Sequence, residues 1–382
     1  MRRAFWLFGL VTAVGGPEVA HAQPLPAAQR VSVSSSVSGL GCGPQAQLAG
    51  GVITVRPGGD DDSATLQCAL DRAGALGVRD VRLTAGTFHA MSLVANDFHG
   101  RLAGAGESRT VIENVPDAYV TPTDFLFTPP SASNPWPSMV ALVDGDFVVS
   151  QLTIRVTGTP TRGWWAGDTE IRALAHGFVI VGREAHAVFD HVTIEGADLP
   201  GDIFGKTVIS GIYFEGAIGA APPPLKGSWA VRDSTFRNLA DGTPSSNLSD
   251  AHVVITGNTY SGCPMASDTD DLVRSTYLFA RNRVVDAEWY GFMLYDYCLS
   301  ADSNCGTHDS TVSIVGNDFG RSGEGVELVG TLGRSNRCIV AGNEVRDVAD
   351  MAVYLGPETA GCLVVSGGKV VDEGSDNQVV PR

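Results

Sequence analysis

Short runs of alternating hydrophobic and polar residues recur in the second half of the chain, and each run ends in Gly-Asn or a close variant. The copies are 253–260 (VVITGNTY), 277–284 (YLFARNRV), 312–319 (VSIVGNDF), 338–345 (CIVAGNEV) and a degenerate 363–370 (LVVSGGKV). The residue before each Asn moves from 257 to 281, 316, 342 and 367, in steps of 24, 35, 26 and 25 residues. A period in this range predicts a solenoid, in which each repeat buries its apolar face only against its neighbours.

The apolar positions in these runs alternate and do not form the i, i+3, i+4, i+7 stripe of a helix, so the runs predict short β-strands. Gly adopts positive φ freely, and Asn is one of the few other residues that does, so each Gly-Asn pair marks a sharp bend. Asn side chains stacked once per coil can also hydrogen-bond one another along the axis. The alternative, hairpin turns of an antiparallel sheet, does not account for a constant spacing.

A second strand precedes the Gly-Asn run in the late coils, and the earlier coils repeat the arrangement. The copies of this strand are 177–182 (GFVIVG), 211–216 (GIYFEG), 291–296 (GFMLYD), 325–330 (GVELVG) and 352–356 (AVYLG). The first two are followed by the outer runs 187–194 (AVFDHVTI) and 229–236 (WAVRDSTF). Three short strands and three turns per coil predict an all-β fold, a right-handed single-stranded parallel β-helix with rungs about 4.8 Å apart.

The segment before the coils predicts an α-helix that caps the solenoid. Residues 61–63 (Asp-Asp-Ser) supply carboxylates and a cap at the helix N-terminus, and Gly74 or Gly77 ends the helix. One apolar stripe runs along it, formed by Leu66, Ala69, Leu70 and Ala73. Such a helix covers the open end of the core, which would otherwise recruit other strand edges. Capping explains the Asp run better than a phosphate or metal loop does.

The N-terminal order of motifs also identifies a resemblance. A strand with an Asp-rich turn at 53–63 (ITVRPGGDDDS), the helix, then 81–88 (VRLTAGTF) and 102–106 (LAGAG), resembles the start of β-helix proteins of the pectate-lyase-like superfamily. The resemblance covers about residues 50–375 and implies the fold. It does not imply one activity, because lyases, hydrolases, epimerases, phage tailspikes and non-catalytic proteins of this superfamily share that start.

The signatures of its best-known enzymes are missing. Polygalacturonases carry an Asn-Thr-Asp motif, a pair of Asp residues and a Gly-His-Gly motif; this chain has only an Asp pair, Asp270-Asp271, with no Gly-His-Gly after it. The Arg-x-Pro-x-x-Arg and Trp-x-Asp-His motifs of pectate lyases do not occur. No catalytic residue is therefore carried over from either family.

The N-terminus predicts export. Arg2 and Arg3, an apolar stretch at 4–16 and Ala20-His21-Ala22 are typical of a secretory signal peptide over 1–22. Residues 23–48, rich in Ala, Ser and Gln, predict a disordered leader, and the β-helix domain spans 49–378. No other segment is apolar over the roughly 18 residues that span a bilayer. We expect a secreted or periplasmic protein without membrane insertion.

Seven cysteines in an exported chain favour disulfides over metal sites. Cys338 and Cys362 lie about one coil apart, Cys42 is placed to tie the leader to Cys68 of the helix, and Cys298 is placed to staple a loop with Cys305. Cys263 is then unpaired. Spacing alone does not fix this pairing.

The formal net charge of −16 excludes nucleic acid and anionic lipid as partners bound by bulk charge. An extracellular polysaccharide remains the expected partner. An acidic polysaccharide would need a local cationic patch or a bound divalent ion, because the chain as a whole repels it.

Along the strand that precedes each Gly-Asn run, alternate side chains are predicted to point into the core and out of the coil. The inward set is Phe292, Leu294, Val326, Leu328, Val353 and Leu355. The outward set is Tyr213, Glu215, Asp271, Val273, Met293, Tyr295, Glu327, Val329 and Tyr354, with Arg274 and Asp296 at strand ends. Side chains pointing out from stacked strands form a long row on which a polymer can lie, and function belongs to sites on that row.

Catalytic candidates come from this row. Asp271 and Glu327 are predicted two rungs apart, with backbones about 9 to 10 Å from each other, near the spacing of inverting glycosidases. Tyr295 and Arg274 lie between and beside them, and a phenol or guanidinium is a suitable base for β-elimination. Asp296 completes the candidate set. The alternative is an ordinary solvated sheet face, which also carries scattered acids and aromatics.

The remaining candidates concern binding. Asp268 and Asp270 offer oxygen ligands for calcium, although a solvated acidic loop is the commoner arrangement. Exposed aromatic rings stack on sugar faces but equally anchor loops. The predicted substrate-binding residues are Trp164, Trp165, Tyr213, Glu215, Trp289 and Tyr354.

These features predict an exported carbohydrate-active β-helix protein, a polysaccharide lyase or glycoside hydrolase. The sequence does not distinguish a lyase from a hydrolase, although we slightly favour a lyase. The alternative is a non-catalytic β-helix that binds glycans, mediates surface attachment or serves a structural role.

Overall fold

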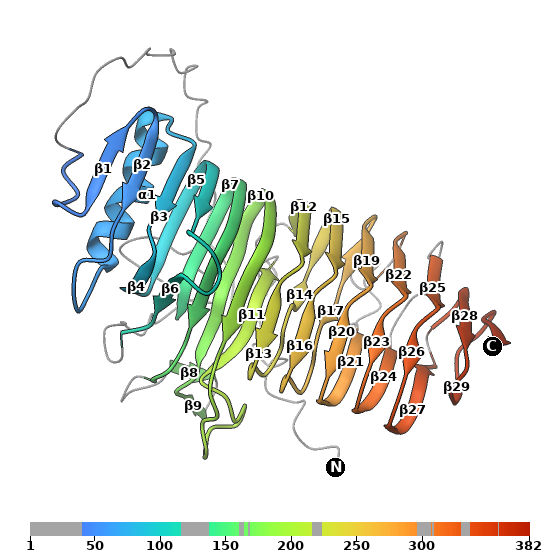
Figure 1. The fold of residues 1–382 in the computed structure, drawn as a ribbon. Coiled ribbons are helices and arrows are strands. Elements are labelled where there is room, and N and C mark those ends of the chain that lie inside the picture. Colours follow the sequence, from blue (N-terminus) through green and yellow to red (C-terminus); the bar gives the residue numbers. More distant parts are fainter. Residues whose placement is uncertain are drawn as a thin grey trace.

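The structure, a computed structural model, describes residues 40–115, 137–159, 164–166, 169–215, 224–295, 307, 309–329, 337–357 and 359–382. These residues form a right-handed parallel β-helix with one α-helix, α1 (Ser63–Leu76), at its N-terminal end (Figure 1). The predicted fold is confirmed. The predicted signal peptide, residues 1–22, lies outside the described residues.

The strands stack in three rows along the axis, and each strand pairs in parallel with its neighbours in the row. Three long strands contribute to more than one row: β5 (Leu93–Ala103), β7 (Ser138–Arg155) and β10 (Leu174–Glu195). Row 1 also contains β2 (Val52–Val55), β3 (Asp80–Leu83), β12 (Leu225–Arg232), β15 (Leu248–Thr256), β19 (Thr276–Ala280), β22 (Thr311–Val315), β25 (Arg337–Ala341), β28 (Cys362–Ser366) and β30 (Gln378–Pro381).

Row 2 contains the shortest strands, β4 (Gly86–His89), β6 (Thr110–Glu113), β13 (Thr235–Arg237), β16 (Thr259–Ser261), β20 (Arg283–Val285), β23 (Asp318–Phe319) and β26 (Glu344–Val345). Row 3 contains β11 (Val208–Glu215), β14 (Ser245–Ser246), β17 (Asp268–Thr269), β21 (Ala287–Tyr295), β24 (Ser322–Val329), β27 (Val348–Leu355) and β29 (Val370–Asp372). Outside the rows, β1 (Ala46–Ala49) pairs antiparallel with β2, β18 (Leu272–Val273) pairs with β15, and β8 (Trp164–Ala166) forms an antiparallel pair with β9 (Thr169–Ile171).

The Gly-Asn bends lie above one another at the corner between rows 1 and 2. Gly257, Gly316 and Gly342 have φ of +71°, +65° and +66°, as a left-handed corner requires. The next residues form a ladder: the side chain of each of Asn258, Asn282 and Asn317 donates to the side chain of the following Asn, and the last acceptor is Asn343. The predicted stacking of Asn side chains is confirmed.

Each Asn of this ladder also satisfies the backbone of the adjacent coil. The side-chain oxygen of Asn282 accepts the backbone N–H of Asn258 at 2.9 Å, and its amide nitrogen donates to the carbonyl of Ile255 at 3.0 Å. Asn258, Asn282 and Asn317 are buried. Because unpaired backbone groups are costly in a buried corner, the amide side chains allow the chain to turn there.

The core is a continuous stack of apolar side chains inside the coils. The rings of Phe236 and Tyr260 stack with centroids 4.9 Å apart, and those of Phe279 and Phe319 with centroids 6.3 Å apart. The buried residues among those predicted to face inward are Phe292, Leu294, Val326, Val353 and Leu355. This confirms the predicted alternation for the late coils, whereas the side chain of Leu328 lies outside the description.

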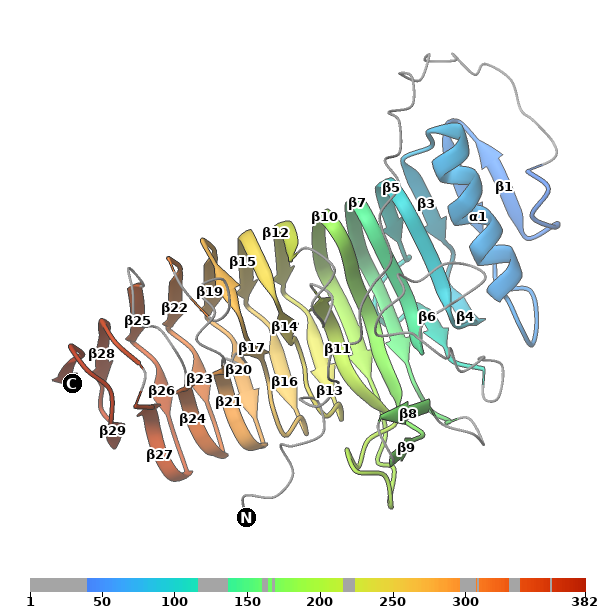
Figure 2. The ribbon, with the colours of Figure 1, turned by 180° about the vertical axis from the view of Figure 1, so that it is seen from behind.

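Helix α1 covers the N-terminal end of this core, as Figure 2 shows from behind. Its buried residues are the predicted stripe, Leu66, Ala69, Leu70 and Ala73. Gly77, with φ of +65°, ends the helix. The Gln67 side chain donates to the carbonyl of Val94 and accepts its N–H, so the helix satisfies part of the β5 backbone. No helix among the described residues is long and apolar enough to cross a membrane.

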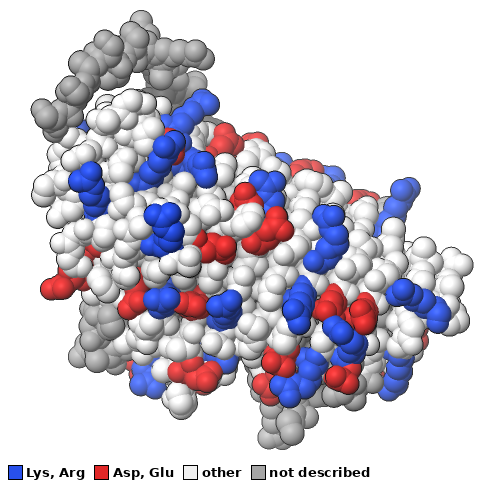
Figure 3. Space-filling model, in the orientation of Figure 1, with Lys and Arg blue, Asp and Glu red and all other residues white. Residues whose placement is uncertain are grey.

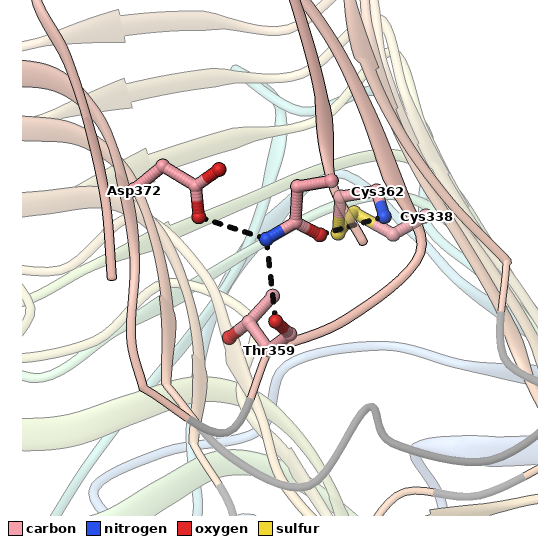
Figure 4. The surroundings of a disulfide bond; sticks show 5 residues. Cys338, Thr359, Cys362 and Asp372 are labelled. Atoms are coloured by element: carbon pink, nitrogen blue, oxygen red, sulfur yellow. Dashed lines mark hydrogen bonds between the residues drawn. A yellow bond between two sulfur atoms is a disulfide. The ribbon is translucent and has the colours of Figure 1, made fainter. Parts of the chain in front are cut away.

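Two of the predicted disulfides are present. Cys42 is bonded to Cys68, and Cys338 to Cys362. The second bond lies between adjacent rungs, beside a turn in which the Asn377 side chain donates to Thr359 and Asp372 (Figure 4). The predicted third pair, Cys298 and Cys305, lies outside the described residues.

The first described residues belong to the folded domain. Leu40, Cys42 and Ala46 are buried, and β1 pairs with β2. Residues 40–48, which the sequence placed in the leader, are therefore part of the N-terminal cap.

Breaking the ladder at its centre should destabilise the protein. Asn282→Ala removes the side chain that bonds the buried N–H of Asn258 and the carbonyl of Ile255. We therefore expect the free energy of unfolding, measured by chemical denaturation, to fall by about 2–4 kcal/mol. Glu344→Ala, at an exposed position beside Asn343, is the control and should change stability by less than about 0.5 kcal/mol. Equal stability of the two variants would contradict the role of the ladder.

Candidate functional site

A cluster of titratable side chains lies on the outer side of row 3, near the middle of the β-helix. We call it the acid cluster, and its members are His176, Tyr213, Glu215, Asp241, Asp268 and Asp270. His176 lies on β10, Tyr213 and Glu215 on β11, and Asp268 on β17. Asp241 forms one isolated β-bridge with Ser210 and another with Met265.

Glycines of the core explain why His176 and Asp241 point outward. Gly177 and Gly242 face inward, because a Cβ on Gly177 would lie 2.9 Å from Ile194 and one on Gly242 would lie 2.5 Å from the ring of Tyr260. The residue before each of these glycines is therefore turned to the outside of the coil. Tyr213 lies between Ile212 and Phe214, which are both buried in the core.

His176 and Tyr213 are in direct contact across adjacent strands. Their ring centroids lie 4.9 Å apart. His176 is only 6% exposed, its Nδ1 has no hydrogen-bond partner among the described residues, and burial lowers its pKa to about 3. The imidazole is therefore neutral at physiological pH. Burial, and secondarily the charge of Glu215, raises the pKa of Tyr213.

Glu215 is the most isolated carboxyl group of the cluster. It is 1% exposed, and within the described part of the chain neither of its oxygens has a hydrogen-bond partner. Burial raises the pKa of Glu215 to about 8. At neutral pH this side chain is therefore mostly protonated.

Asp241 and Asp268 form a carboxyl pair. Each of the two carboxyl groups changes the pKa of the other, so they lie close enough to interact. Burial raises the pKa of both groups, that of Asp268 to about 7, and the neighbouring carboxylate raises that of Asp241 further. Burial, followed by the charge of Asp271, also raises the pKa of Asp270, whose Oδ1 accepts the N–H of Asn247 at 3.2 Å. The cluster thus holds several acids able to exchange protons near neutrality.

The predicted register of Asp271 was wrong. Asp268 pairs with Met293, and Met293 pairs with Glu327, so Asp268 is the acid two rungs from Glu327. Asp271 lies in the corner after β17, with φ of +46°, because the strand ends at Thr269. The buried side chain of Met293 lies in the rung between.

Of the other predicted catalytic residues, Arg274 lies apart from the acid cluster. Arg274 is exposed at a corner with φ of +48° and forms an ion pair with Asp250 at 2.7 Å. Tyr295 is half-buried on β21, opposite Val329. Glu327 lies on β24, but its side chain, like the whole of Asp296, is outside the description.

The predicted binding residues are dispersed. Tyr213 and Glu215 lie in the acid cluster, whereas the Tyr354 hydroxyl bonds Glu373 at 2.8 Å near the C-terminal end. Trp289 is about one-third exposed on β21. Trp164 and Trp165 pair with Ile171 and Glu170 in the β8–β9 hairpin, and their side chains are not described.

Another cluster brings possible metal ligands together. Within the described ranges, one group of three acidic or His residues brings its ligand atoms within 4.8 Å of one another: Asp190, His191 and Asp233. In this group Asp190 is already paired with Arg232 at 3.3 Å. Asp268 and Asp270, the predicted calcium ligands, belong to no such group among the described residues.

The acid cluster differs from the ordinary charged surface. On the face shown in Figure 3, basic and acidic side chains alternate over the strands. Ion pairs across rungs at the surface include Arg346 with Asp318 and Arg321 with Asp286. In contrast, no residue of the acid cluster forms an ion pair with Lys or Arg in the described part of the chain.

The sequence reasoning missed His176 and Asp241. Both directly precede a glycine of row 3, as Ser210, Tyr290 and Glu324 do in other coils. This repeated residue-glycine step was visible in the sequence. It would have assigned these positions to the outer face.

Comparisons with known proteins do not assign the chain to a family. No family model and no curated protein matches the chain. Among solved structures, the A-module of mannuronan C-5 epimerase AlgE4 from Azotobacter vinelandii is 14% identical over 85% of this chain and 95% of that chain, with a TM-score of 0.29. The catalytic unit of a GH87 α-1,3-glucanase from Streptomyces thermodiastaticus is 11% identical, over 88% and 70% of the two chains, with a TM-score of 0.32.

A third solved structure, tailspike protein 3 of bacteriophage CBA120, is 10% identical over 84% of this chain and 57% of that chain, with a TM-score of 0.25. These neighbours are parallel β-helix proteins, and the class of this chain follows from its own strand pairing.

The acid cluster should make the protein less stable at alkaline pH. The folded protein keeps protons on Glu215 and Asp268 up to pH about 8 and about 7, whereas the unfolded chain loses them near pH 4 to 4.5. Stability contributed by these groups therefore falls as pH rises from about 5 to 8. We expect the Tm at pH 8 to be roughly 3–10 °C below that at pH 5.5.

Glu215→Gln should flatten this dependence, because glutamine does not titrate. Glu184→Gln is the matched control, since Glu184 is exposed on β10, and should leave it unchanged. A Tm of Glu215→Gln that falls with pH as steeply as that of the unaltered protein would contradict the assignment to Glu215.

Proposed function

We propose that this chain is an exported carbohydrate-active protein that performs acid–base chemistry on a polysaccharide lying along the outer side of row 3. The observation that carries the proposal is the acid cluster, in which a neutral imidazole, a phenol and four carboxyl groups share one buried stretch of the row. Strongly perturbed titratable groups gathered in one place are a feature of catalytic sites. The predicted signal peptide and two disulfides support an oxidising, extracellular compartment.

We favour proton transfer of the lyase type over hydrolysis by two carboxylates, because an imidazole and a phenol lie in contact beside the carboxyl groups of the cluster. In β-elimination a base removes the proton from the carbon next to a uronate carboxyl group. The bond to the leaving glycosidic oxygen breaks as a carbon–carbon double bond forms, and an acid protonates that oxygen.

His176 and Tyr213 are the groups that suit this step. Imidazole and phenol groups both take part in proton transfer in enzymes, and the two rings are in contact. Tyr213 and Asp268 are the partly exposed members of the cluster, so the substrate would approach from their side.

A second candidate function is glycan binding without turnover. The deep burial of His176, Glu215 and Asp241 favours it, because these side chains are shielded from a polymer lying on the surface. Binding without any product would support this alternative.

The proposed reaction is tested on a panel of uronate and neutral polysaccharides. We expect absorbance at 235 nm from an unsaturated product with a uronate polymer. Tyr213→Phe, which keeps the ring contact with His176, should lower kcat/KM at least about 100-fold, as should His176→Asn. His252→Asn, on the exposed face of β15, is the control and should retain full activity.

Reducing ends without absorbance at 235 nm would identify hydrolysis instead and contradict the lyase step. Full activity of both Tyr213→Phe and His176→Asn would contradict the site.

A further inference from the structure

The outer face of row 1 carries a column of apolar side chains, broken once by a serine. In each strand of row 1 from β7 to β28, one outward residue pairs with its counterpart in the next rung. Each lies between two buried residues of its own strand, as alternation requires of an outward position. We call these eight residues the apolar column: Val148, Val188, Ala230, Val254, Leu278, Ser313, Ile339 and Leu363.

The column is partly open to solvent along its whole length. Val148, Ile339 and Leu363 are 38%, 37% and 37% exposed, and the other members are half-buried. Seven steps between rungs of about 4.8 Å make the column roughly 34 Å long, although it is one side chain wide. A continuous exposed row of apolar groups with polar groups beside it indicates an interaction surface.

The width and the charge of this surface argue against a second copy of the chain as its occupant. No member exposes more than 38% of its surface, so seven apolar side chains offer well under the roughly 800 Å² per partner that a stable protein interface buries. The formal net charge of −16 also opposes contact between two copies. The column itself carries no charge, and beside it Asp190 and Arg232 pair with each other at 3.3 Å.

An uncharged polysaccharide has the matching chemistry. A sugar ring presents C–H groups on its faces and hydroxyl groups on its edges. The faces are released from water when they lie on apolar side chains. Ser228, Thr276 and Thr311 flank the column on one side and Thr256 on the other, so their hydroxyl groups are placed to bond the sugar edges.

We propose that the apolar column is a second carbohydrate-binding surface, on which an uncharged, extended polysaccharide lies along the axis of the β-helix. This inference goes beyond the proposed function, because the column belongs to row 1 and the acid cluster to row 3. The surface holds the protein on a neutral polymer and takes no part in proton transfer. One apolar contact per rung lets a regular polymer meet a regular series of side chains.

The test measures retention of the full chain by microcrystalline cellulose and by chitin, which are both uncharged and extended. We expect at least one of them to bind the protein. Its Kd should change less than about 2-fold when NaCl is raised to about 0.5 M, because no ion pair contributes to binding.

Two variants assign the binding to the column. Val254→Ser combined with Leu278→Ser should raise the Kd at least about 10-fold, because it removes two apolar contacts beside the existing gap at Ser313. Serine already occupies this column at 313, so the strands tolerate it. Ser313→Leu closes the gap and should lower the Kd about 3-fold or more. The matched control is Ile203→Ser, at a residue that is 49% exposed outside the column, and it should leave the Kd unchanged.

Three results would overturn the inference. The first is no retention by either polymer, which leaves the proposed reaction of the acid cluster standing. The second is a Kd that neither the double variant nor Ser313→Leu alters, or that Ile203→Ser alters as strongly. The third is a dimer in sedimentation experiments that the double variant dissociates, which would make a second copy of the chain the occupant.

Discussion

The structure depends on hydrogen bonds between one coil and the next at a buried corner. A solenoid rung buries its apolar face only against neighbouring rungs, so nothing distant in the sequence fixes its position. The ladder from Asn258 to Asn343 fixes the rungs instead, because each side chain bonds both the next Asn and the backbone of the adjacent coil. The buried stacks of aromatic rings are then held in register.

That register is what brings the acid cluster together. His176 and Asp268 are 92 residues apart in the chain, yet both flank Tyr213 because their strands occupy the same row. Hydrogen-bonded rungs lie about 4.8 Å apart and cannot easily separate, so carboxyl groups that would repel one another in solution are kept close. Their raised pKa values reflect this imposed proximity and burial.

The fold was predictable because its signals are periodic or local. The step of the Gly-Asn bends, the apolar stripe of α1 and the spacing of Cys338 and Cys362 each specify a feature that the structure contains. The site was predictable only in part. Tyr213 and Glu215 follow strict alternation, but at β17 the strand ends after two residues and Asp271 turns into the corner. Alternation counted through that corner assigned the wrong acid to the row.

The same limit explains why His176 and Asp241 were missed. Each lies just before a glycine that faces the core, and a glycine gives no hydrophobic signal for an inward position. A side chain at that step faces out of the coil and is nevertheless buried against its neighbours. Such positions suit acid–base groups because burial shifts their pKa while the adjoining rungs hold them rigid. In a β-helix the residues that precede inward-facing glycines therefore belong in the search for a site from sequence.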